Sequence, residues 1–106
     1  MELNLDAVAV THNDETHRFE ATVDGLRSLL DYRRFPDRIV LHHTEVPPRI
    51  EGHGMAAKLT RTALDFARAR HLRVVPLCPY VAAFLRKHSE YQDLVSSADL
   101  GKILSD

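Results

Sequence analysis

The sequence has a single cysteine, no long apolar run and no large excess of charge of either sign. The single cysteine, Cys78, excludes an internal disulfide and a zinc site built from several cysteines. Because a free thiol is easiest to keep in a reducing compartment, we expect a cytoplasmic protein. The longest apolar stretches are too short to cross a membrane, and the first residues lack the basic and apolar segments of a signal peptide. We therefore expect no membrane partner.

Charge is balanced over the whole chain but uneven along it. The 14 Lys and Arg residues are matched by 15 Asp and Glu residues, which gives a net charge of −1 with neutral histidines. A domain that binds nucleic acid is normally basic overall, so this balance predicts no nucleic-acid partner. Residues 49–73 carry six bases and two acids, whereas residues 89–106 carry four acids and one base. The basic middle suits a small anionic ligand, although solvated charges on a helix surface would give the same pattern.

The length of 106 residues predicts one domain, with a core at about residues 12–95 and a tail at residues 96–106. Apolar and β-branched patterns predict four strands, over residues 5–10, 18–23, 26–33 and 39–46. Asp24-Gly25 predicts a tight hairpin between the second and third of these strands. A helix, a strand and a second helix are expected to follow, over residues 54–71, 72–77 and 79–88. This order, ββββ-α-β-α, defines an α+β fold with a mixed sheet, and a last short strand is expected at residues 93–95.

A loop with two glycines precedes the long predicted helix and reads Arg49-Ile50-Glu51-Gly52-His53-Gly54-Met55-Ala56. The first four amides of a helix have no partner within it and carry partial positive charge. Such a loop can therefore bind phosphate oxygens through its backbone. It lacks the Gly-Lys-Ser/Thr of a Walker nucleotide loop and the Gly-x-Gly-x-x-Gly of a dinucleotide site, which excludes both. The alternative is a glycine-containing turn that binds no ligand.

The spacing Arg-x-x-Gly-x-Gly before a helix resembles the acetyl-CoA pyrophosphate loop of the GNAT N-acetyltransferase superfamily. The resemblance continues in other segments, namely Arg18-Phe19-Glu20, Asp24-Gly25, Leu30-Asp31-Tyr32-Arg33, His43-Thr44-Glu45-Val46-Pro47 and Pro76-Leu77-Cys78-Pro79-Tyr80-Val81. Together these segments, which lie between about His12 and Val95, look like the short, single-domain Yjdj-type branch of the superfamily. The resemblance implies a GNAT-like fold whose central sheet splays apart between the fourth and fifth strands to admit the pantetheine arm. Pro76 is compatible with that gap, since part of its strand would have no ladder partner.

The resemblance also implies that acetyl-CoA is the co-substrate. The residues expected to hold it are Arg49, Val46, Gly52, His53, Gly54, Met55 and Ala56, with Arg61 near the phosphates. The sequence departs from full-length GNAT enzymes in one respect, because a short polar turn rather than two helices separates its first two strands. Those helices normally wall the acceptor site, so we expect its acceptor side to be open. The histidines show no metal-ligand spacing, and we expect no metal.

Four residues are candidates for catalysis, namely Cys78, His43, Glu45 and Tyr80. Cys78 is expected at the N-terminus of the second helix, where a thiolate is stabilised and the pKa of a thiol falls. It could accept the acyl group covalently or protonate the departing CoA thiolate; the alternative is a small buried core residue. Tyr80 resembles in position the tyrosine with which many GNAT enzymes protonate CoA, and its alternative is plain helix packing.

His43 is expected on the fourth strand beside the thioester. A neutral imidazole there could accept a proton from the attacking amine or activate Cys78; a half-buried structural histidine is the alternative. The resemblance points to His43 rather than His42, and neighbouring strand residues face opposite sides of a sheet. Glu45 shares the face of His43 and is a second candidate base, unless it is only a surface carboxylate.

These features predict a small acetyl-CoA-dependent N-acetyltransferase that acts on an amine of a protein or a small molecule. The acetyl group would pass to the amine directly or through Cys78. The alternative is an acyl-CoA-binding or sensing module with little or no turnover, which the missing acceptor wall motivates. A domain that keeps the fold for protein interaction alone fits less well with the intact glycine loop.

Overall fold

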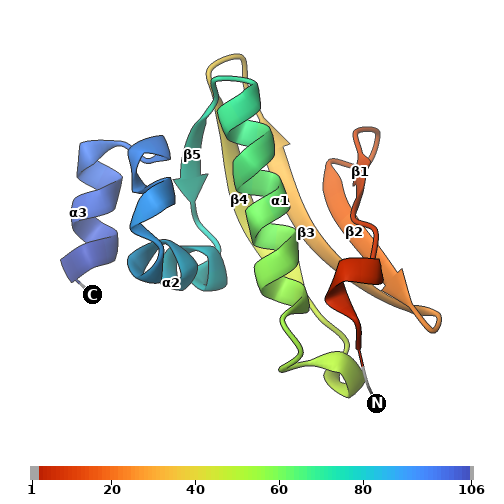
Figure 1. Ribbon diagram of the computed structural model, residues 1–106. Coiled ribbons are helices and arrows are strands. Elements are labelled where there is room, and N and C mark those ends of the chain that lie inside the picture. Colours follow the sequence, from red (N-terminus) through yellow and green to blue (C-terminus); the bar gives the residue numbers. More distant parts are fainter. Residues whose placement is uncertain (1–2, 106) are drawn as a thin grey trace.

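The computed structural model describes residues 3–105, which form a five-stranded sheet with α1 packed along it (Figure 1). The strands are β1 (Thr11–Asn13), β2 (Arg18–Val23), β3 (Leu26–Arg34), β4 (Arg38–Glu45) and β5 (Arg73–Pro76). The helices are α1 (Met55–Ala69), α2 (Pro79–Lys87) and α3 (Ser97–Ser105), with short 3-10 helices η1 (Leu5–Ala7), η2 (Pro48–Ile50) and η3 (Ser89–Leu94). The predicted α+β architecture in the order ββββ-α-β-α is confirmed, with one further helix, α3, after it.

The strands follow one another across the sheet in sequence order. The first four pair antiparallel, and β5 pairs parallel to β4. A parallel pair requires a crossover, which α1 provides while it packs against β2, β3, β4 and β5. Leu59, Ala63 and Leu64 of α1 join Leu30 and Ile39 of the sheet in one core, and all five are 0% exposed.

A two-residue turn joins β2 to β3. Asp24 and Gly25 have φ angles of 49° and 75°, the pair of positive values that a tight primed turn requires. Val23 and Leu26 are the paired residues on either side of the turn. The hairpin that Asp24-Gly25 predicts is therefore confirmed.

β4 carries one extra residue relative to β3. Tyr32 pairs with Leu41 and Asp31 pairs with His43, which leaves His42 as a β-bulge between them. A bulge of one residue reverses the faces to which the following side chains point.

The bulge decides which side chains of β4 face α1. Thr44 pairs with Leu30, which is fully buried in the core beneath α1. Because side chains alternate along a strand, His43 and Glu45 face the opposite side of the sheet. The sequence predicts that His43 and Glu45 share one face of the sheet, and the strand pairing shows that this is the face opposite α1.

β4 and β5 separate after a short paired segment. Their register covers Arg38–Leu41 and Arg73–Pro76, and the amide of Cys78 donates to the carbonyl of Leu41 over 2.9 Å. β4 then continues to Glu45, whereas the chain after β5 turns into α2. The predicted splay is present, and the proline of β5 lies where the ladder ends.

The predicted first strand over residues 5–10 is wrong. Leu5–Ala7 forms η1, and the first strand is Thr11–Asn13. The side chain of Asn4 accepts a hydrogen bond from a backbone amide of η1, and Lys58 of α1 donates to a carbonyl of the same turn. These two bonds stabilise a helical turn where the apolar pattern predicts an extended segment.

The predicted strand over residues 93–95 is also wrong, because most of this segment belongs to η3. Arg68 of α1 binds both carboxylate oxygens of Asp93, over 2.8 and 2.9 Å. The hydroxyl of Tyr91 donates to Asp65, also of α1, over 3.0 Å. Both contacts hold the segment against α1 and away from a strand edge.

The C-terminal tail, for which the sequence predicts no element, forms α3 over most of its length. Ile103 is 5% exposed within the core, and Arg86 of α2 donates to its carbonyl over 2.8 Å. The core therefore extends beyond residue 95. Asp106, the last residue of the expected tail, lies outside the described residues.

Candidate active site

A cleft of about 390 Å³ lies between the end of β4 and the first turn of α1. Its lining consists of Thr44, Val46, Glu51, Gly52, Gly54, Met55, Ala56, Ala57 and Tyr80. Five of the residues that the sequence assigns to acetyl-CoA belong to this lining, namely Val46, Gly52, Gly54, Met55 and Ala56. The cleft is next to the gap where β4 and β5 have separated.

The glycine loop leaves the N-terminus of α1 without a side-chain cap. Gly54 is the N-cap residue, with a φ of 89° and no side-chain hydrogen bond. The amide of Lys58 donates to the carbonyl of Gly54, so the amides that precede it have no partner within the helix. Gly52 has a φ of 80°, and a Cβ there would meet no atom within 4 Å. The open loop and the unpaired helix amides fit the pyrophosphate of acetyl-CoA.

Three further candidates for acetyl-CoA binding lie outside the lining of this cleft. Arg49, in η2, and His53, in the loop, have exposed side chains. Arg61 points from α1 towards α2, and its guanidinium lies 5.2 Å from the ring centroid of Phe84. Contact between these side chains and phosphate stays a prediction.

The two base candidates of β4 lie together. His43 Nε2 is 3.6 Å from Glu45 Oε1, and their side chains are 51% and 63% exposed. Both face the side of the sheet opposite α1, whereas Thr44 between them faces the cleft. Because Cys78 contacts Thr44, the structure does not bring His43 and Cys78 together.

The thiol of Cys78 is buried at the gap between β4 and β5. Cys78 is 3% exposed, and its Sγ lies 3.3 Å from Oγ1 of Thr44. Cys78 is the N-cap residue of α2, as the sequence predicts, and it makes no side-chain capping bond. Thr44 is a site residue that sequence reasoning missed. The one available signal was its place between His43 and Glu45, which puts it on the other face of the strand.

Tyr80 lies at the edge of the cleft and is 39% exposed. Burial raises the pKa of its phenol above the ordinary value of 10.0; the nearby Cys78 raises this pKa further, and Arg61 opposes both effects. The phenol is therefore protonated at neutral pH. Of the two candidate proton donors, Tyr80 lines the cleft, whereas Cys78 does not line it and contacts Thr44.

A second hollow, of about 450 Å³, adjoins the end of β4. Its lining consists of Arg27, Thr44, Glu45, Val46, Pro47, Pro48 and Glu51. Thr44, Val46 and Glu51 line both the cleft and this hollow, so the end of β4 can be reached from two sides. Residues 14–17 join β1 to β2 as a plain turn, and α2 and α3 lie beyond β5 (Figure 1). The side chains of His43 and Glu45 are accordingly open to solvent.

The structure contains no cluster of metal ligands in its described part. Within residues 3–105, no three His, Cys, Asp or Glu side chains gather closely enough to hold a metal ion. Nor does any helix in this range combine the length and the apolar character needed to cross a membrane.

Known proteins resemble this chain over most of its length. Protein NATD1 of Bos taurus is 34% identical over 84 residues, which cover 76% of this chain and 74% of that protein. Protein NATD1 of Homo sapiens is 32% identical over 84 residues, with coverage of 76% and 74%. Protein NATD1 of Danio rerio is 28% identical over 91 residues, with coverage of 81% and 83%. Residues 18–94, which include the glycine loop and both sides of the cleft, match the family described as GCN5-related N-acetyl-transferase. The chain therefore belongs to the GCN5-related N-acetyltransferase family.

Proposed function

We propose that this protein transfers the acetyl group of acetyl-CoA to a primary amine. The proposal depends on one observation, the cleft between the glycine loop at the uncapped N-terminus of α1 and the end of β4. This end of β4 no longer pairs with β5. Membership of the GCN5-related family supports the same activity. The free and buried thiol of Cys78 suits a cytoplasmic site of action.

The loop and β4 hold the co-substrate in this proposal. Backbone amides from His53 to Ala56 bind the pyrophosphate, and the exposed Arg49 adds positive charge beside them. Val46 follows directly on β4, beyond the residues that pair with β5, and offers its backbone to the pantetheine arm. When bound, acetyl-CoA supplies the acetyl group as an activated thioester.

The amine is expected to arrive from the open side of β4, where His43 and Glu45 lie together. His43 takes the proton that the amine nitrogen loses as it bonds to the carbonyl carbon, and Glu45 stabilises the imidazolium. Tyr80 supplies the proton that the sulfur gains when the carbon–sulfur bond breaks. One proton leaves the amine and one reaches the sulfur, so the reaction is balanced without another reagent.

Two observations support direct transfer over a route through acetylated Cys78. The thiol is 3% exposed, and its polar neighbour is Thr44. A nucleophilic thiol needs an adjacent base, and the two base candidates of β4 face the other side of the sheet.

Calorimetric titration with acetyl-CoA, followed by an assay of CoA release with a panel of amines, tests the proposal. We expect binding in about the micromolar range and CoA release that depends on the added amine. A protein that is folded by circular dichroism and binds no acetyl-CoA would overturn the proposal.

An acyl-CoA-binding or sensing module is a second candidate, which the open face beside His43 and Glu45 favours. An acceptor site that is open to solvent binds a small amine poorly. The open face does not weaken the binding of acetyl-CoA, which occupies the cleft at the glycine loop. Tight binding without transfer to any amine of the panel would favour this second function.

A further inference from the structure

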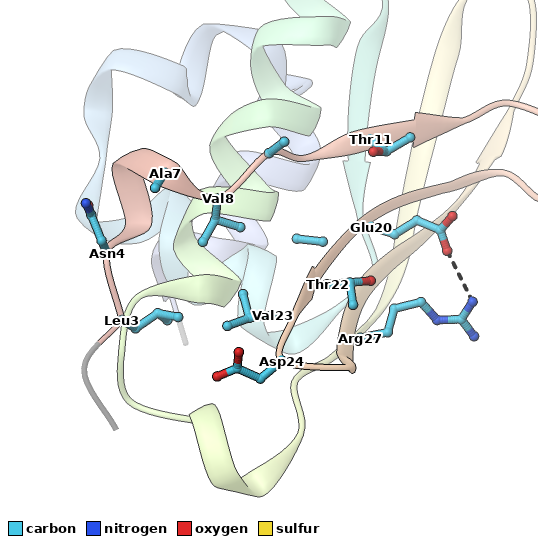
Figure 2. Close-up of a pocket in the computed structure, with 12 residues that line it drawn as sticks. Leu3, Asn4, Ala7, Val8, Thr11, Glu20, Thr22, Val23, Asp24 and Arg27 are labelled. Carbon is cyan, nitrogen blue, oxygen red and sulfur yellow. Dashed lines mark ion pairs between the residues drawn. The ribbon is translucent and has the colours of Figure 1, made fainter.

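A third hollow, of about 810 Å³, lies between the N-terminal segment and the β2–β3 hairpin (Figure 2). Leu3, Asn4, Ala7 and Val8 form one wall of it, and residues 22–24 form the other. Glu20 and Arg27 also line it and form an ion pair whose closest atoms are 3.5 Å apart. The acetyl-transfer chemistry proposed above makes no use of this hollow.

The third hollow adjoins the candidate active site. Arg27 lines both the third hollow and the hollow beside Pro47. The latter shares Thr44, Val46 and Glu51 with the acetyl-CoA cleft. We call the path from Glu51 past Arg27 to the hairpin the acceptor groove. It leads from the place where an amine would react to the outer edge of β2.

The acceptor groove carries an excess of negative charge. Its acids are Glu20, Asp24, Glu45 and Glu51, and its one base is Arg27. Arg27 is already paired with Glu20. Neither Asp24 nor Glu51 has an ion-pair partner among residues 3–105. Unpaired carboxylates along a solvent-filled groove favour a cationic occupant.

The outer edge of β2 is free beside this hollow. β1 ends its pairing with β2 at Thr11, which lies opposite Glu20. In a two-residue hairpin, Val23 and Leu26 form the hydrogen-bonded pair, so the backbone groups of Thr22 point away from β3. The edge therefore offers one N–H and one C=O to an extended peptide.

We propose that the acceptor is an extended, basic polypeptide segment that lies in the acceptor groove. This inference rests on the proposed transferase activity. The reacting amine, from a lysine or a chain terminus, lies beside Glu45, and a second cationic side chain of the same segment lies beside Asp24. The third hollow holds the part of the segment that follows along the edge of β2.

The spacing between the two cationic groups follows from the sheet. Glu45 pairs with Leu29, which pairs with Glu20, so the path crosses two strand spacings, or about 10 Å. Asp24 lies four residues beyond Glu20, which adds a displacement of about 13 Å along the strand. An extended chain covers the resulting distance of about 16 Å in about five residues. A small amine reaches only the first position and gains nothing from Asp24.

Matched peptides test this inference. One set contains a single acceptor lysine with arginine about five residues away, a second set has glutamate in that place, and Nα-acetyl-lysine amide is the small amine. We expect kcat/KM for the arginine peptide to exceed that for the glutamate peptide by about tenfold at low salt, and the difference to shrink at high salt.

Asp24→Asn is the variant of choice because asparagine also adopts positive φ, so the hairpin is kept. It should raise KM for the arginine peptide by about two- to fivefold through loss of one ion pair. The matched control is Glu15→Gln, the same change of charge at an exposed turn residue at the other end of β2. This control should leave the kinetics unchanged.

The outcomes separate this inference from the proposed function. Equal rates for both peptide sets, or a preference for the small amine, would overturn the inference while transfer itself still occurs. An unchanged KM in Asp24→Asn, with acetyl-CoA affinity equal to that of the unaltered protein, would also overturn it. Absence of acetyl-CoA binding would instead overturn the proposed function.

Discussion

Oγ1 of Thr44 and Sγ of Cys78 lie 3.3 Å apart and connect β4 to the start of α2 across the gap in the sheet. The amide of Cys78 also donates to the carbonyl of Leu41, the last residue of β4 that pairs with β5. The side-chain contact with Thr44 lies three residues further along β4. Thr44 also lines the cleft, whereas the buried Cys78 does not. We therefore expect the thiol of Cys78 to take no part in acetyl transfer.

We expect Cys78→Ala to keep acetyl transfer within about threefold of the unaltered protein. The substitution removes a small buried side chain and one weak hydrogen bond, at a cost of about 1 kcal/mol in the free energy of unfolding. Steady-state kinetics and thermal denaturation measure the two effects. Intact mass of the unaltered protein after exposure to acetyl-CoA should show no added acetyl group.

A covalent route would give the opposite pattern. Cys78→Ala would then lose transfer by more than about a hundredfold while still binding acetyl-CoA, and the unaltered protein would carry an acetyl group on Cys78. Cys78→Ser is the matched control, since serine keeps a hydroxyl beside Thr44 and loses the thiol.

Tyr80→Phe should lower kcat by about a hundredfold and leave the affinity for acetyl-CoA within a few-fold. Burial raises the pKa of the Tyr80 phenol above 10.0, because the charged phenolate is poorly solvated there. The donor is therefore present at every lower pH and is lost only as the pH rises through that raised value. The phenol should add no alkaline limb to the rate profile below pH 10.0.

The measurement is kcat from pH 6 to pH 10 for both proteins. An alkaline loss of rate near neutral pH that disappears in Tyr80→Phe would contradict the proposed role. Tyr91→Phe is a control, because it removes another tyrosine hydroxyl, which is bonded to Asp65 away from the cleft.

Local signals predicted the parts of the fold that depend on a few neighbouring residues. Asp24-Gly25 specifies its own turn because both residues tolerate positive φ. The glycine loop is likewise set by Gly52 and Gly54, whose φ angles are 80° and 89°. The geometry of this loop was therefore readable from the sequence.

Long-range contacts decided what the sequence could not show. The bulge at His42 arises from the pairing of β4 with β3, and it determines that Thr44 faces the cleft. The bond between Arg68 and Asp93 spans 25 residues and turns the expected last strand into η3. The contact of Cys78 with Thr44 likewise joins residues that are 34 positions apart, so the sequence did not reveal it.

Gly54→Ala should weaken acetyl-CoA binding and lower the free energy of unfolding by about 1–3 kcal/mol. Gly54 has a φ of 89°, and a Cβ there would lie 2.7 Å from Cδ1 of Leu5. The loop must then shift, and with it the amides that are expected to bind pyrophosphate. Calorimetric titration with acetyl-CoA and thermal denaturation measure the two effects.

Gly101→Ala is a control that should raise the free energy of unfolding, whereas Gly54→Ala should lower it. Gly101 lies within α3, and a Cβ there would meet nothing within 4 Å. Alanine in a helix interior should stabilise the protein by about 0.5–1 kcal/mol and leave acetyl-CoA binding unchanged. Equal acetyl-CoA affinity in both variants would argue against a role of the loop in binding.

A partly buried polar pair should make the stability of the protein depend on pH. His12 Nε2 lies 2.5 Å from the hydroxyl of Tyr32, and the imidazole stacks on Phe19 with ring centroids 4.5 Å apart. Burial lowers the pKa of His12 below 6.5; the cations Arg70 and Arg34, with His17, lower this pKa further, and Asp14 opposes them. The folded protein therefore resists protonation at this histidine.

The sign of the effect follows from the two protonation states. Because the pKa of His12 is lower in the folded state, the unfolded chain binds a proton more readily as the pH falls below 6.5, and the free energy of unfolding decreases. At the alkaline end, burial raises the pKa of Tyr32 to about 12, so stability falls again as the pH rises from 10.0 towards that value.

His12→Gln should remove the acid part of this dependence, since glutamine stays neutral and can still bond to Tyr32. Between pH 7.5 and pH 5.0 we expect the unaltered protein to lose about 2–4 °C more in Tm than the variant. His71→Asn is the matched control, because it removes an exposed histidine at a position with a φ of 56°, which asparagine tolerates. If His71→Asn reduced the loss in Tm as much as His12→Gln does, the acid dependence would come from histidine content and not from the burial of His12.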